Sequence, residues 1–176
     1  MSVIVRMPKP TLCLIGWCTI SAITWALPGW TQTIGDEAEL ERLRTKAEEA
    51  IANDDPEGAA MAMGRAAMMA KRLSLVNKND GDSARLYQGA ESLFRSQEHG
   101  YRAMALFRRA GGQLPASSGV CGTLALAQAS VQHAISELAG VTAPPAALTE
   151  QIKRWHDTAD DWVTVVAAMI TDYQCP

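Results

Sequence analysis

The stretch ARLYQGAESLFRSQEHGYRAMALFRRAGGQLP, residues 84–115, decides the fold that this chain is expected to adopt. Aromatic and small residues recur in it at spacings of three and four, which places them on one face of a helix. Two such faces are present, and their members are Tyr87, Ala90 and Phe94, followed by Ala103, Phe107 and Ala110. The stretch therefore predicts two short antiparallel helices on which the rest of the chain stacks.

A turn is expected between the two faces, at the sequence Gln-Glu-His-Gly of residues 97–100. Gly100 suits the left-handed conformation that often closes a helix. Gly111 and Gly112 then mark the end of the second helix, and Pro115 prevents the helix from resuming.

This stretch resembles a tetratricopeptide repeat, which is a helix–turn–helix unit of about 34 residues. The positions that match the family in type and spacing are Tyr87, Phe94, Ala103, Phe107, Ala110 and Pro115. Ala90 and Glu91 depart from it, because the family has Leu and Gly there. The resemblance covers one clear unit, and an ordinary antiparallel helix pair within a bundle is the alternative.

The resemblance implies a function as well as a fold. Tetratricopeptide units stack so that their inner helices line a groove, which accepts a peptide or a partner helix. The side chains that we expect in or near that groove are those of Tyr87, Gln88, Glu91 and Arg95.

The first 26 residues have the pattern of a signal peptide. Arg6 and Lys9 precede an uncharged apolar run, Thr11–Leu27. Small residues on both sides of Trp25 suit a signal peptidase, so we expect cleavage after Ala26 and export to the periplasm or out of the cell. An uncleaved membrane anchor is the alternative.

The remaining chain is expected to be one helical repeat-like domain, residues 36–176, that follows a linker of residues 27–35. Its composition is rich in Ala, which favours helix. We therefore predict an all-α fold of about six helices in stacked antiparallel hairpins. Without residues 1–26 the 16 basic side chains fall to 14 against 19 acidic ones, a net charge of −5. That balance argues against nucleic acid as a partner.

Local signals mark the other helices. Capping residues are expected at Asp36, at Asp55 and at Ser117 or Ser118. A degenerate second copy of the hairpin ends in a helix whose face carries Ala59, Met63 and Ala66. The last helix has the most regular apolar stripe of the chain, made of Leu148, Ile152, Trp155, Ala159, Trp162, Val166, Met169 and Tyr173. We expect it to lie along the stack as a capping helix, and an intermolecular coiled-coil seam is the alternative.

Two cysteines remain after residue 26, Cys121 and Cys175. An even pair in an exported protein predicts a disulfide. The sequence also has four closely spaced methionines, Met61, Met63, Met68 and Met69. Such a cluster favours packing or an exposed, adaptable binding surface, and a carrier of a metal or small ligand is the alternative function.

The sequence shows none of the catalytic patterns that we considered. It has no GxSxG elbow and no phosphate-binding glycine loop. His156 and Asp160 lie one turn apart, but a zinc site needs at least three protein ligands. We therefore expect a non-enzymatic protein–protein interaction module of the bacterial envelope, with a peptide or protein partner and no cofactor.

Overall fold

The computed structural model describes residues 30–143 and 146–176. This part of the chain is entirely helical and contains no strand, so the predicted all-α class is confirmed. Its elements are α1 (Trp30–Ala52), α2 (Pro56–Val76), α3 (Gly81–Arg109), α4 (Ser118–Ala139), the short 3-10 helix η1 (Ala146–Leu148) and α5 (Thr149–Asp172). Residues 1–26, the predicted signal peptide, lie outside the described residues.

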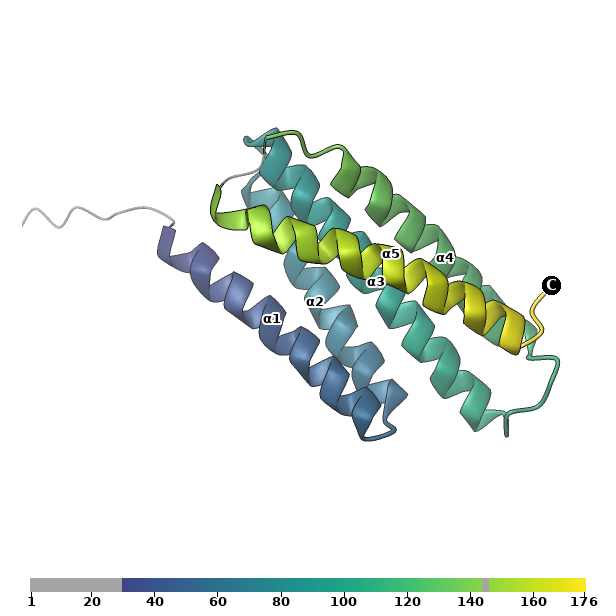
Figure 1. Cartoon of the computed structure of the whole chain (residues 1–176). Coiled ribbons are helices and arrows are strands. Elements are labelled where there is room, and N and C mark those ends of the chain that lie inside the picture. Colours follow the sequence, from purple (N-terminus) through teal and green to yellow (C-terminus); the bar gives the residue numbers. More distant parts are fainter. Residues whose placement is uncertain (1–29, 144–145) are drawn as a thin grey trace, which may run out of the picture.

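Consecutive α-helices run up and down and lie next to one another (Figure 1). The long helix α3 is central, because α2 packs against one of its sides and α4 against another. At the ends of the series, α1 packs on α2, and α5 packs on both α4 and α3. Figure 1 shows α5 crossing in front of α3.

The predicted turn at residues 97–100 is wrong, because α3 runs without a break from Gly81 to Arg109. Gly100 instead permits close packing: a Cβ atom there would lie 2.7 Å from Cζ2 of Trp162 and 3.2 Å from Cε of Met169. The predicted end of the helix is correct, since Gly111 and Gly112 have positive φ values of 76° and 67°.

The hairpin expected within residues 84–115 is therefore a single helix, and the described residues contain five long helices where about six were expected. The two predicted apolar faces lie on this one helix, where Ala90, Phe94 and Ala103 are buried. The neighbours of α3 come from elsewhere in the chain, from α2 and α4. The tetratricopeptide-like arrangement is not confirmed.

Two of the three predicted helix starts are correct and one is wrong. Asp55 caps α2 as predicted, with its carboxylate accepting the Gly58 N–H at 2.8 Å. Ser117 likewise caps α4. The predicted cap at Asp36 is wrong, because α1 already begins at Trp30 within the expected linker, and the Asp36 carboxylate accepts a hydrogen bond from Arg72.

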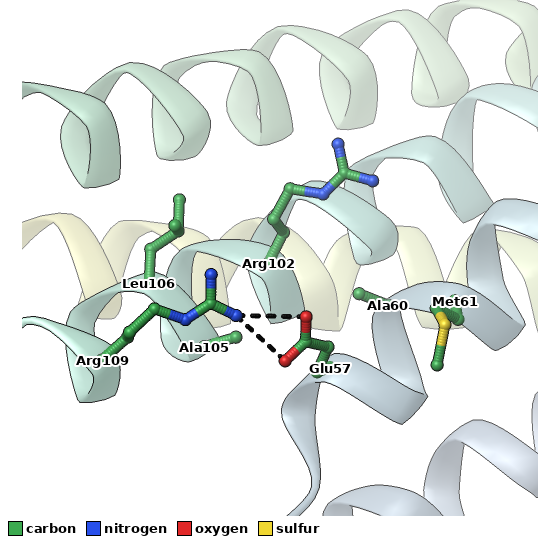
Figure 2. Close-up of a pocket in the computed structure, with 7 residues that line it drawn as sticks. All are labelled: Glu57, Ala60, Met61, Arg102, Ala105, Leu106 and Arg109. Carbon is green, nitrogen blue, oxygen red and sulfur yellow. Dashed lines mark hydrogen bonds and ion pairs between the residues drawn. The ribbon is translucent and has the colours of Figure 1, made fainter.

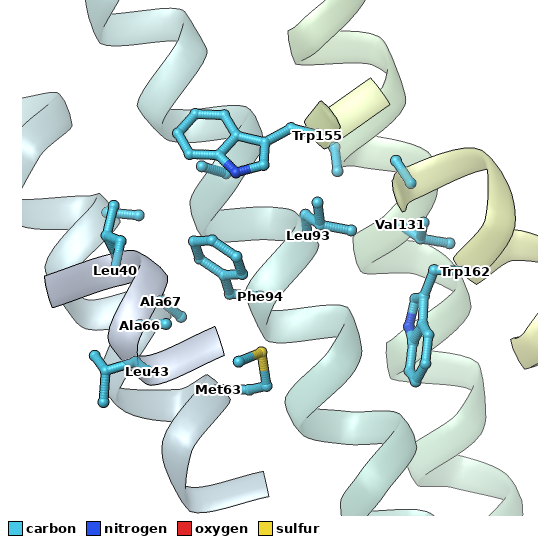
Figure 3. Packing of buried hydrophobic residues seen from close by; sticks show 14 of the residues in the cluster. Leu40, Leu43, Met63, Ala66, Ala67, Leu93, Phe94, Val131, Trp155 and Trp162 are labelled. Atoms are coloured by element: carbon cyan, nitrogen blue, oxygen red, sulfur yellow. The ribbon is translucent and has the colours of Figure 1, made fainter. Parts of the chain in front are cut away.

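Aromatic side chains join α5 to α3 (Figure 3). The indole of Trp155 lies edge-on to the rings of Tyr87 and Phe94, with centroid distances of 6.2 Å to each. Trp162 makes the same kind of contact with Tyr101 at 5.2 Å. The apolar stripe of α5 thus packs largely inside its own chain.

The predicted disulfide is confirmed, with the sulfur atoms of Cys121 and Cys175 2.03 Å apart. It ties the C-terminal tail to the first turn of α4. The ring of Tyr173 stacks on that of Phe107 at 4.1 Å, so the tail is also held to the end of α3. None of the described helices has the length and apolar character that crossing a membrane requires.

Candidate functional site

The outer face of α2 carries a row of large apolar side chains in contact with water. Met61, Met68 and Leu75 are 60%, 63% and 63% exposed. They are spaced seven residues apart, which is about two helical turns, so they lie on one face. We call these three residues the apolar row. The opposite face of α2 is filled by the buried residues Ala59, Ala62, Ala66, Ala67, Ala70 and Leu73.

Basic side chains flank the apolar row on both sides. Arg65 and Arg72 are exposed and share a face, and Arg72 reaches toward α1, where it pairs with Asp36 at 2.6 Å. On the side of α3, the Lys71 ammonium lies 4.0 Å from the Glu91 carboxylate. We call the apolar row together with the facing side chains of α3 the α2–α3 face.

A buried carboxylate organises the α3 side of this face. Glu98 is 7% exposed and accepts hydrogen bonds from Arg95 at 2.8 Å and from Arg102 at 2.6 Å. Gly64 of α2 makes room for it, because a Cβ atom there would lie 3.1 Å from Cδ of Glu98. The two guanidinium groups are themselves partly exposed. Glu98 therefore holds two cationic groups at the edge of the apolar row.

A hollow of about 220 Å³ lies at the Met61 end of the row (Figure 2). Met61 and Leu106 supply apolar surface to it, and Arg102 and Arg109 supply cationic groups. Arg109 donates to both carboxylate oxygens of Glu57, at 3.1 and 3.0 Å. A hollow of this size, apolar with charged walls, suits one bulky side chain of a partner.

Helices α2 and α3 are the basic part of an acidic chain. Helices α2 and α3 together hold eight basic and four acidic side chains, a net charge of +4. The whole chain has a net charge of −3. Helices α1 and α5 carry the opposite balance, with −3 on each. The excess positive charge is thus concentrated on α2 and α3, and the excess negative charge on α1 and α5.

The four side chains expected in a groove are only partly brought together. Tyr87 is buried and donates its hydroxyl to Glu37 at 2.7 Å, so it does not reach the surface of this face. Burial, followed by the Glu37 carboxylate, raises the pKa of Tyr87. Gln88 is exposed on α3, one helical turn before Glu91, and Arg95 lies beside the apolar row.

The methionine cluster is divided by the fold. Met63 is 1% exposed and belongs to the core, and Met69 is partly buried against it. Met61 and Met68 alone are exposed, and two helical turns separate them by about 10 Å along the axis. Among residues 30–143 and 146–176, no three His, Cys, Asp or Glu side chains are grouped as metal ligands.

A second, wider hollow of about 650 Å³ lies beside the disulfide, at the start of α4. Its walls are uncharged side chains, mostly small ones such as Ala116, Gly122 and Ala125. This surface has neither the large apolar anchors nor the charged groups of the α2–α3 face.

Comparison of the chain with protein-family models, with curated proteins and with solved structures gives no match. The fold and the site thus define the class at a general level. Within residues 30–143 and 146–176 the chain is all-helical, and the outer face of α2 is both apolar and basic.

Proposed function

We propose that this protein is a non-enzymatic protein–protein interaction module of the bacterial envelope, and that the α2–α3 face is its binding surface. The observation that carries the proposal is the apolar row. Three large apolar side chains stand in one line on a helix whose opposite face already fills the core. Aligned exposed apolar groups of this kind are typical of interaction surfaces.

The residue types support this proposal. Met and Arg are enriched at protein interfaces, while most other charged residues are depleted there. Met also adapts its shape to a partner, because its side chain is unbranched and polarizable. A seven-residue spacing of apolar groups supplies one of the two apolar positions per heptad by which helices pair.

The proposed location is the periplasm or the outside of the cell. It rests on the signal-peptide pattern in residues 1–26 and on the pairing of Cys121 with Cys175, since disulfides persist in oxidising compartments. The alternative function, a carrier that uses Met61–Met69, finds no comparable support. Of its four methionines, only Met61 and Met68 are largely exposed, and their backbone positions are about 10 Å apart along the helix axis.

Photo-crosslinking in cells that produce the protein tests the proposed function. Benzoylphenylalanine replaces Met68 in one variant and Gln132, an exposed residue of α4, in a matched control. We expect discrete crosslinked products from position 68 that are absent from position 132. Products that are equal at both positions, or absent from both, would contradict a binding role for the α2–α3 face.

A further inference from the structure

We infer that the occupant of the α2–α3 face is an amphipathic helix of another protein, with an apolar seam flanked by acidic side chains. This inference rests on the function proposed above and specifies the chemistry of the partner.

The geometry of the row specifies a helix. Met61, Met68 and Leu75 repeat at seven residues, and a partner helix presents side chains at the same interval along one seam. The row spans 14 residues, or about 21 Å at 1.5 Å per residue. A partner helix of about four turns would cover it. The hollow beside Met61 would receive one bulky side chain at one end of that seam.

The flanks specify acidic side chains. Arg65 and Arg72 border the row on the α1 side, and Arg95 and Arg102 border it on the α3 side. Residues beside the seam of a helix pair set the choice of partner by their charge. Glu or Asp at those positions of the partner would face guanidinium groups that the protein holds in place on both sides.

A second copy of this chain does not offer an apolar seam flanked by acidic side chains. If the two α2 helices ran antiparallel, Arg65 and Arg72 would face the same residues of the other copy. If they ran parallel, Arg65 and Arg72 would face the α3 side of the other copy, which carries Lys71, Arg95 and Arg102. Like charges at such flanking positions destabilise a pair. Helix α1 is acidic, but its apolar side chains Leu40 and Leu43 are already buried in its own chain.

The first 29 residues of the chain do not offer acidic side chains beside an apolar seam either. Their apolar run, Thr11–Leu27, has no charge, and their only charged side chains are the cationic groups of Arg6 and Lys9. A segment of that composition offers nothing to the four arginines that flank the row. The charges therefore favour a separate protein as the source of the helix.

Two synthetic 21-residue peptides test the inference. Both carry the same Leu and Ile seam, with Glu at all flanking positions of one and Lys at those of the other. Fluorescence anisotropy measures the binding of each to the full protein. We expect the Glu peptide to bind about tenfold more tightly or better, with an advantage that shrinks as salt is raised.

The variant Arg65→Glu/Arg72→Glu should lose that preference. The control Lys153→Glu/Arg154→Glu makes the same change in net charge on exposed positions of α5 and should retain it. Circular dichroism verifies that both variants are folded.

Each failure has its own meaning. Equal binding of the two peptides would contradict the inference that the partner has acidic flanking side chains. Failure of both peptides to bind would contradict the inference that the partner is a helix. A dimer in sedimentation equilibrium that Met68→Glu dissociates would overturn the separate partner in favour of a second copy. The proposed function is decided independently, by the crosslinks from position 68.

Discussion

Replacing Gly100 by Ala tests the continuous form of α3 and its packing against α5. The new methyl group would stand 2.7 Å from Cζ2 of Trp162, an indole that is 7% exposed and in edge contact with Tyr101. Ala in place of Gly favours a helix interior by about 1 kcal/mol. Overpacking a filled core costs about 1–3 kcal/mol. We therefore expect a net loss of about 1 kcal/mol in the free energy of unfolding.

The second step is to repeat Gly100→Ala in a Trp162→Phe background. Phe lacks the outer part of the indole that the methyl group would meet, so the same change should now stabilise the protein by up to about 1 kcal/mol. Gly122→Ala on α4 is the control. The described structure places no other heavy atom within 4 Å of its Cβ position, and we expect a gain of similar size.

Urea unfolding followed by circular dichroism measures all of these variants. The sign reversal between the two backgrounds is the decisive result. If Gly100→Ala destabilised the protein equally with Trp and with Phe at position 162, the glycine would be needed for its backbone conformation. The continuous helix would then be wrong and the turn predicted from the sequence would be right.

Three further predictions concern the disulfide, one helix cap and one half-buried imidazole. Reducing the Cys121–Cys175 bond, which spans 54 residues, should lower the free energy of unfolding by about 4 kcal/mol in the chain-entropy model, and a double Ser variant should not respond to reductant. Asp55→Ala removes the acceptor of a capping hydrogen bond and should cost about 1 kcal/mol in urea unfolding; an unchanged midpoint would contradict the cap. Burial lowers the pKa of His99 from its ordinary value of 6.5. The unfolded chain then binds the proton first, so stability should fall as the pH drops through this value, and less steeply in His99→Gln; parallel pH profiles would contradict this.

Sequence signals that act over one turn predicted the structure well. Asp55 before Pro56, and Ser117 after Pro115, each identified a helix start. The stripe of α5 predicted its buried face, because a period of three and four residues needs no knowledge of the partner. The disulfide could be predicted because Cys121 and Cys175 are the two cysteines that follow residue 26.

Signals that depend on distant residues were misjudged. A glycine within a helical pattern can mark either the end of a helix or a place where another element packs closely against it. At Gly100 it is the close packing of Trp162, which lies 62 positions further along the chain. Asp36 has the residue type of a cap, but the helix already begins before it.

Part of the candidate site could be predicted from the sequence. Met61 and Met68 share a face by their spacing alone. Whether that face is buried or exposed depends on which side of α2 meets α1 and α3, and the alanines on the opposite side fill that contact. Leu75 continues the spacing and would have extended the row. The family resemblance placed Tyr87, Gln88, Glu91 and Arg95 at a binding surface, and that placement stays a prediction. The burial of Tyr87 was not foreseen, because it depends on contacts with other helices.

Methionine-methyl NMR of the full protein, titrated with the Glu-flanked peptide, shows whether the α2–α3 face receives a partner helix. We expect the methyl signals of Met61 and Met68 to shift with increasing peptide, while that of buried Met63 stays in place. Signals of Met61 and Met68 that remain unchanged at saturating peptide, or shifts confined to methionines elsewhere in the chain, would contradict the claim that the α2–α3 face receives a partner helix.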